Sequence, residues 1–385
     1  MPRPFRWLAA LGAVLAFLAT TPRAQQPDTA IADAIRMQAE RALSVAPRNY
    51  GRLLAPAQAG VRVLGVQVGV AASGAESITI DLSQRALTYD PSGNLEPLLE
   101  TILQATASSV RGAPRVDYHF TIDGIQLERF LPAPPVKITP RAQPLTMGGV
   151  VLVSPGHGVY WDEESGEWHL QRPRLFGIVE DEVNWDIGRT LLDELLGAHI
   201  NATLARYTQR DAASGLSGSP RWEEAAKYFI ETLGAPGDVW NFGADDYARD
   251  INARPFYANW IDAAAIISIH NNGGQETGTE TWYDATNGWE AESSRLADIV
   301  NRHVVSAIRT RYSPAWVDRG LRSCDGCKGE NRLATRPAVI VELAYMDTQT
   351  PDNDALHDET FKRIIAQAIR EAVQEWAAQL DCCHG

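Results

Sequence analysis

The chain has 385 residues, 45% of them hydrophobic, which is enough for two domains with cores of ordinary size. Its 48 acidic residues outnumber its 35 basic residues, and the formal net charge is −13. Because an acidic surface repels phosphates and the sequence shows no basic cluster, we expect no nucleic-acid partner.

The N-terminus has the anatomy of a secretory signal peptide over residues 1–24. Arg3 and Arg6 precede an uncharged apolar stretch, residues 8–18, which is too short to span a bilayer. The alternative is a retained membrane anchor, because Pro22 interrupts the usual cleavage pattern. We expect cleavage, no membrane span in the mature chain, and a secreted or extracytoplasmic protein of the cell envelope or periplasm. Loss of three arginines would change the net charge from −13 to −16.

A small α+β accessory domain is expected over residues 25–131. Hydrophobic patterning predicts a helix, two strands, a second helix after Asn94 and a further strand, over residues 28–44, 64–70, 78–82, 94–103 and 116–122. The segment from Ser77, the second helix and the stretch ending at Gly124 resemble a domain of spore-germination lipoproteins and some cell-wall hydrolases. This resemblance covers about residues 55–130 and implies an accessory module without naming its ligand.

Five prolines in residues 132–147 favour an extended, semi-rigid linker, so we place a domain boundary there. Residues 148–385 then form a second domain, which we expect to fold alone. It begins with a strand over residues 149–154 and ends with a helix over 361–380. Strands that alternate with helices predict an α/β architecture.

Three apolar runs of this second domain end on residues that can serve a metal. The strand at 149–154 leads into Pro-Gly-His-Gly with His157, residues 263–269 lead into His270, and residues 337–341 lead into Glu342. Ligands of open α/β sheets bind beyond the carboxyl ends of the strands, so these residues are expected to converge. Two histidines with carboxylates have the composition of a hydrolytic zinc site.

Taken singly, each of these residues has an ordinary explanation. His157 can be a surface histidine in a turn, and Glu180 can be the acidic first residue of a helix whose apolar stripe begins at Val183. His270 is more suggestive, since a ring at the end of a buried strand needs a hydrogen-bond partner or a metal. Glu342 interrupts an apolar run, and buried carboxylates are enriched at active sites. The four together predict metal-assisted hydrolysis.

Ordered motifs in the second domain carry a family resemblance. They are Pro-Gly-His-Gly, Glu180 before Asp-Glu-Val-Asn, Arg254 with Ala258-Asn259, Ser-Ile-His270-Asn-Asn and Pro-Ala-Val-Ile-Val-Glu342-Leu. Over about residues 148–378 the chain resembles the zinc-dependent N-acetylmuramoyl-L-alanine amidases that include cell-separation and spore-cortex enzymes. Two departures are Ser154, where the family usually has Asp, and Val159, where it has a second Gly.

The resemblance implies zinc bound by His157, Glu180 and His270, with Glu342 as the catalytic carboxylate. It implies an α/β fold with a mixed twisted sheet flanked by helices. The substrate would be peptidoglycan or a muropeptide, cut at the amide between the lactyl group of N-acetylmuramic acid and L-alanine. Two alternatives stay open: an exported zinc peptidase or deacylase acting on another amide, and a catalytically silent wall-binding protein. The sequence names no protein partner.

The four cysteines are Cys324, Cys327, Cys382 and Cys383. In a cytosolic protein they would suggest a second, structural zinc, whereas an exported protein favours disulfides. Four cysteines allow three pairings, and the sequence does not choose between them. We expect no catalytic role for them.

Overall fold

The computed structural model describes residues 29–45, 60–71, 76–88, 95–131, 149–210 and 213–384. The predicted signal peptide and the predicted linker at 132–147 lie outside these residues, as do the side chains of Cys382 and Cys383. No helix in the described part of the chain is long and apolar enough to cross a membrane.

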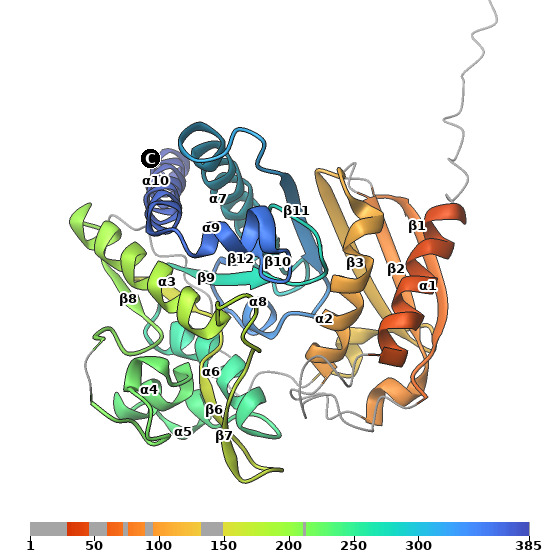
Figure 1. Cartoon of the computed structure of the whole chain (residues 1–385), viewed down its shortest axis with the longest axis horizontal. Helices are drawn as coiled ribbons and strands as arrows, with labels where there is room; N and C mark the ends of the chain where they lie inside the picture. Colours follow the sequence, from red (N-terminus) through yellow and green to blue (C-terminus); the bar gives the residue numbers. More distant parts are fainter. Residues whose placement is uncertain are drawn as a thin grey trace, which may run out of the picture.

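Ten strands in the described ranges form one mixed sheet in the order β1-β2-β3-β11-β10-β12-β9-β5-β8, with β4 paired to β3 at the side (Figure 1). The strands are β1 (Val63–Val70), β2 (Glu76–Leu82), β3 (Arg115–Ile122), β4 (Ile125–Gln126), β5 (Val151–Pro155), β8 (Ala202–Leu204), β9 (Ala265–Asn272), β10 (Thr279–Tyr283), β11 (Asp318–Cys324) and β12 (Ala338–Tyr345). A separate hairpin is formed by β6 (Val159–Asp162) and β7 (Glu167–Leu170).

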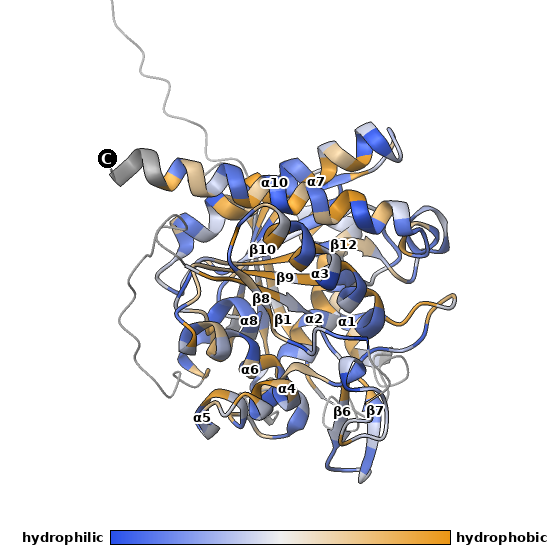
Figure 2. Ribbon diagram, turned by 90° about the vertical axis from the view of Figure 1, so that its left-hand side faces the viewer, coloured by the Kyte–Doolittle hydropathy of each residue, from blue (hydrophilic) through white to orange (hydrophobic). Residues whose placement is uncertain are grey.

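Helices cover both faces of the sheet because successive strand residues point to opposite sides. One face packs on the long helices α3 (Glu180–Gly197), α7 (Glu290–Arg311) and α10 (Glu359–His384). The other packs on α4 (Ala226–Thr232), α5 (Gly237–Trp240) and α6 (Asp246–Trp260). In Figure 2 the central strands are largely hydrophobic, whereas α7 and α10 alternate between hydrophobic and hydrophilic residues. The predicted stripe of α3, at Val183, Ile187, Leu191 and Leu195, is buried.

The N-terminal part of the chain extends this sheet instead of forming its own. The helices α1 (Thr29–Val45) and α2 (Leu95–Thr106) pack on β1, β2 and β3 (Figure 1). β3 pairs in parallel with β11, so that Leu321 lies opposite Arg115 and Cys324 opposite Tyr118. The core around α1 and α2 also takes in Trp282 and Ile340 from the C-terminal half. One sheet and one core therefore join the segments on either side of residues 132–147.

The predicted fold class is confirmed: a mixed sheet is flanked by helices, and the N-terminal part of the chain is an α+β region. The boundary at 132–147 stays a prediction, as does the resemblance of the first part to the lipoprotein domain. Cys324 and Cys327 form a disulfide, which excludes the two pairings that would join them to the tail cysteines. It lies just before the short helix α8 (Gly329–Arg332), which supplies a residue to the site described next.

Candidate active site

The loop after β5 holds His157 in an unusual backbone conformation. Its φ is +65°, in the left-handed region that non-glycine residues rarely adopt. The flanking glycines have steric reasons to be there: a Cβ on Gly156 would lie 2.2 Å from Cε1 of His270, and one on Gly158 would lie 2.5 Å from Cα of Ala225. The Pro-Gly-His-Gly sequence thus brings the two histidine rings into contact, with centroids 4.7 Å apart.

His270 and Glu342 come from neighbouring parallel strands. On β9 and β12 these two residues are register partners, and Ser268 and Ile340 are partners two residues earlier. The two-residue repeat of a strand places all four on the same face of the sheet. The residues between them, such as Ile269 and Val341, belong to the core under α3, α7 and α10.

Glu180 is the first residue of α3, where the helix dipole favours a negative charge. It is only 3% exposed. Its Oε1 accepts hydrogen bonds from the backbone N–H of Asn271, at 2.9 Å, and from Nδ2 of Asn184, at 3.2 Å. These bonds fix the carboxylate beside the end of β9.

Three potential ligand atoms converge at this point. His157 Nε2 lies 3.2 Å from Glu180 Oε1 and 3.2 Å from His270 Nδ1, and His270 Nδ1 lies 3.5 Å from Glu180 Oε1. All three residues are buried, as is Glu342 at 3% exposure. The structure therefore brings the four predicted site residues into one place. Within the described ranges, His157, Glu180 and His270 form a group whose ligand atoms lie close enough together to hold a metal ion.

The charges around the two histidines differ strongly. Burial lowers the pKa of His157 to about 4, and the nearby Arg172 adds to this effect. Burial also acts to lower the pKa of His270, but the carboxylates of Glu330 and Glu180 outweigh it and raise that pKa to about 10. Carboxylates that favour a proton on His270 favour any cation at the same point.

The two carboxylates of the site also differ. Burial acts to raise the pKa of Glu180, yet the two histidines and Arg172 hold it well below its usual value. Burial raises the pKa of Glu342 to about 7, although Lys328 and His270 act to lower it. Glu342 Oε2 is buried and has no hydrogen-bond partner among the described residues. Glu180 is thus an anion, and Glu342 can exchange a proton near neutral pH.

A chain of buried polar residues connects the outer sides of the two histidine rings. Nδ1 of His157 lies 3.0 Å from Gln171 Oε1, and Gln171 donates through Nε2 to Asp250 Oδ2 at 3.0 Å. Arg254 donates to both Asp250 and Glu330. Glu330 Oε1 lies 2.9 Å from Nε2 of His270, which closes the chain. Each ring therefore has one nitrogen held by the protein and the other directed at the three-residue group.

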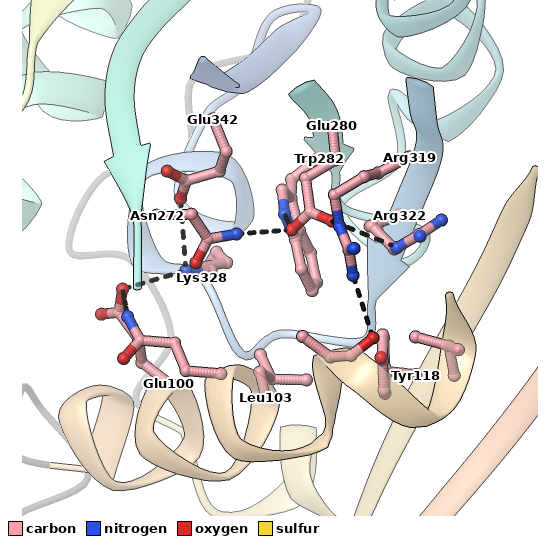
Figure 3. A pocket seen from close by; sticks show the side chains of 13 residues that line it. Glu100, Leu103, Tyr118, Asn272, Glu280, Trp282, Arg319, Arg322, Lys328 and Glu342 are labelled. Carbon is pink, nitrogen blue, oxygen red and sulfur yellow. Dashed lines mark hydrogen bonds and ion pairs between the residues drawn. The ribbon is translucent and has the colours of Figure 1, made fainter. Parts of the chain in front are cut away.

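A small, partly polar cavity lies beside Glu342, and Figure 3 shows the side chains around it. Asn272, Glu342 and Lys328 form one side, and Leu103 of α2 lies across from them. Lys328 Nζ is 3.9 Å from Glu342 Oε1 and 5.3 Å from the centre of the Trp282 ring. The N-terminal part of the chain thus contributes a wall of the candidate active site.

Comparison with known proteins places the chain in a family. Residues 151–375 match the family model described as N-acetylmuramoyl-L-alanine amidase, and this match covers more than half of the chain. The chain belongs to this family. It is therefore an enzyme of the amidase class, which confirms the resemblance carried by the motifs. Among curated proteins, no sequence matches the chain.

Several solved amidases are similar to this chain at low identity. AmiC2 of Nostoc punctiforme is 20% identical over 59% of this chain and 96% of its own, with a TM-score of 0.39. The catalytic domain of CwlV from Bacillus (Paenibacillus) polymyxa is 20% identical over 59% and 97%, with a TM-score of 0.38. CwlD from Clostridioides difficile, solved in complex with the GerS lipoprotein, is 15% identical over 60% and 98%, with a TM-score of 0.39.

The two departures from the amidase motif have structural counterparts. Ser154 is fully buried, and its Oγ donates to Glu330 Oε2 at 3.3 Å. Position 154 has no carboxylate of its own, but the carboxylate of Glu330 from α8 lies beside it. His157 is oriented by Gln171 and not by position 154. Val159 begins β6, whose hairpin with β7 leads to Gln171. In this chain the two histidines therefore have Gln171 and Glu330 as their partners.

Several residues around the site were not predicted from the sequence. Gln171 and Arg172 lie in the segment 160–179, which looks like an insertion longer than the amidase pattern requires, and Glu330 lies in a polar Lys-Gly-Glu-Asn run typical of a surface. Glu100 lies on α2, far from the amidase motifs in sequence. Arg254 stood within a motif, and its total burial could have been suspected from the apolar residues around it.

Proposed function

We propose that this amidase uses one zinc ion to hydrolyse the amide bond between the lactyl group of N-acetylmuramic acid and L-alanine of the stem peptide. Membership of the amidase family supports peptidoglycan as substrate. The observation that carries the proposal is the buried group of His157, Glu180 and His270 next to Glu342.

The residues present fit a zinc ion. Two histidine nitrogens and one carboxylate oxygen are a known ligand set of catalytic zinc, which keeps a fourth position open. Ligands about 2.0–2.1 Å from a tetrahedral metal lie about 3.3 Å from one another. The three separations here are 3.2, 3.2 and 3.5 Å. The remaining nitrogens of both rings already have partners in Gln171 and Glu330, as ligating histidines usually do.

When bound, zinc would polarise the scissile carbonyl and make a water molecule more acidic. The chain's own part in catalysis centres on Glu342. Its pKa of about 7 lets the carboxylate accept a proton from the attacking water and return it to the departing amine. Its free Oε2 provides the acceptor atom. Lys328, next to the other oxygen, orients the carboxylate.

We also propose export of the enzyme to the cell envelope, the periplasm or the medium. Support comes from the basic residues Arg3 and Arg6, the apolar stretch at 8–18, and a family whose substrate is peptidoglycan. The Cys324–Cys327 disulfide fits an oxidising compartment.

Digestion of purified peptidoglycan tests the proposed reaction. Wild-type enzyme is expected to release stem peptides that begin with a free L-alanine, identified by mass analysis. Chelation should stop the release, and added zinc should restore it. His157→Ala and His270→Ala should each remove most of the metal. Cleavage within the stem peptide would make the enzyme a peptidase, and stoichiometric zinc that survives both substitutions would place the metal elsewhere.

A further inference from the structure

Glu100 reaches from α2 into the catalytic cavity beside Lys328 (Figure 3), and its carboxylate also contacts Arg172 of the C-terminal half. Its carboxylate lies 3.1 Å from Nη2 of Arg172 and 3.6 Å from Nζ of Lys328. The side chains of these cations are only 11% and 10% exposed. Burial acts to raise the pKa of Glu100, but Lys328 and Arg172 outweigh it and lower the pKa to about 2. A carboxylate is thus held between two buried cations.

The same two cations flank the catalytic groups. Nε of Arg172 lies 3.6 Å from Glu180 Oε2, on the side of the metal ligands. Lys328 Nζ lies 3.9 Å from Glu342 Oε1, on the side of the proton acceptor. An anion bound between Arg172 and Lys328 is therefore next to the reacting groups, at the position that Glu100 now takes.

Both cationic groups are held in fixed positions by other contacts. Nη1 of Arg172 donates to the hydroxyl of Tyr247 at 2.8 Å and to the carbonyl of Gln171 at 3.2 Å, which leaves Nη2 to face Glu100. The ammonium group of Lys328 lies over the Trp282 ring. Fixed, buried donors bind carboxylates well, because a charge-assisted hydrogen bond is about twice as strong as a neutral one.

The charge of the two cations and of the whole chain indicates which group this site binds. The chain has a net charge of −13, so its surface as a whole repels anionic peptides, and an acidic substrate must be met by local cations. A stem peptide carries carboxylates at its C-terminus and on acidic side chains. We propose that Arg172 and Lys328 form a subsite for a carboxylate of the stem peptide, and that Glu100 occupies this subsite while α2 lies against the cavity. The proposal rests on the peptidoglycan amidase function above.

The packing of α2 makes the two occupants exclusive. Leu103 and Gln104 line the cavity opposite Glu342. α2 is also in close contact with the loop after β9, since a Cβ on Gly274 would lie 2.6 Å from the carbonyl oxygen of Gln104. One carboxylate fills the space between the cations, so Glu100 must withdraw before the substrate carboxylate can enter. Removal of the negative charge at position 100 should therefore strengthen substrate binding.

Glu100→Gln tests the competition, because glutamine keeps the shape of the side chain without its charge. With a soluble muropeptide, KM is expected to fall roughly threefold or more, given the strength of hydrogen bonds to charged groups. Glu96→Gln is the matched control. Glu96 lies one turn earlier on α2 and accepts from the backbone N–H of Gly329 at 2.9 Å. The KM of the Glu96→Gln variant should stay close to that of the wild type.

The substrate side gives the second measurement. Wild-type enzyme should prefer a muropeptide with free carboxylates over the same muropeptide with amidated carboxylates by roughly tenfold in kcat/KM. Lys328→Met should remove most of this preference, whatever its effect on the absolute rate.

The subsite is refuted if Glu100→Gln leaves KM unchanged or raises it, or if Lys328→Met keeps the full preference for free carboxylates. Equal KM changes in Glu100→Gln and Glu96→Gln would show that Glu100 has only a structural role, and this result would also refute the subsite. A wild-type enzyme that cleaves neither muropeptide would instead contradict the proposed function itself.

Discussion

Each histidine of the candidate metal group has one ring nitrogen fixed by the protein and the other turned inward. For His157 the fixing partner is the neutral amide of Gln171, and for His270 it is the carboxylate of Glu330. Glu330 is in turn held by Arg254, which is fully buried, and by the hydroxyl of Ser154. Such partners fix the tautomer and orientation of a ligating ring.

Removal of Glu330 should therefore weaken metal binding. For Glu330→Ala we expect the zinc affinity, measured by competition with a chelator, to fall roughly 10- to 100-fold. Asn331→Ala is the control: it shortens a buried neighbour in α8, whose Nδ2 donates to the carbonyl of Trp282 at 3.2 Å, without touching either histidine. It should bind zinc almost as the wild type does. Equal losses in both variants would mean that α8 matters only for folding.

Candidate site residues could be predicted at this scale, but their hydrogen-bond partners could not. Strand ends and interrupted apolar runs indicate His157, His270 and Glu342, because a polar group in such a place needs a reason. Glu330 gives no such signal, because a glutamate in a polar run is ordinarily exposed. Only the fold shows that α8 returns over the end of β9. The contact of Gly156 with the His270 ring likewise depends on tertiary structure.

At the scale of elements, periodicity predicted the strands of the N-terminal part well. The alternating runs at 64–70, 78–82 and 116–122 correspond to β1, β2 and β3, each extended by one or two residues. The partners of these strands could not be predicted, since alternation indicates a half-buried strand but not its neighbour. The parallel pairing of β3 with β11 is therefore a finding of the structure.

A pH-dependent contact links β3 and the end of β11. His119 on β3 lies 2.5 Å from Asp325, which follows β11, and the hydrogen bond to Asp325 raises the pKa of this half-buried histidine. Because the folded-state pKa of His119 is raised, its protonation stabilises the fold fully at pH values below the unfolded pKa of about 6.5. This stabilisation is lost as the pH rises through the folded-state pKa. The loss of Tm in His119→Gln should accordingly be larger at pH 6 than at pH 9. An equal loss at both pH values would show that protonation of His119 does not contribute.

For the molecule as a whole, one sheet carries both the N-terminal part and the catalytic part. Besides the β3–β11 pairing, Nη2 of Arg319 donates to the carbonyl of Ala107, and Nη1 of Arg322 donates to that of Ala113. The ring of Tyr118 stacks on that of Trp282, with centroids 5.7 Å apart. The predicted boundary at 132–147 thus separates two parts of the sequence that share one sheet.

Truncation tests the consequence of this shared sheet. A fragment of residues 149–385 loses the strand beside β11 and uncovers Trp282, so its Tm should be roughly 5 °C or more below that of the full mature chain. The open edge of β11 should also promote self-association. Thermal unfolding followed with light scattering measures both effects. A monomeric fragment with the Tm of the full chain would show that the first part adds nothing to the stability of the second.

The central claim is that Glu342 moves the proton while other residues hold the metal. Glu342→Gln keeps the shape of the side chain and removes the proton acceptor. The decisive measurement is the release of peptides beginning with L-alanine by wild type and by this variant, each with its zinc content determined. We predict full zinc content and a rate lower by about 10²-fold or more, in line with general acid–base catalysis. Loss of zinc in the variant would make Glu342 a ligand, and an unchanged rate would exclude it as the proton acceptor.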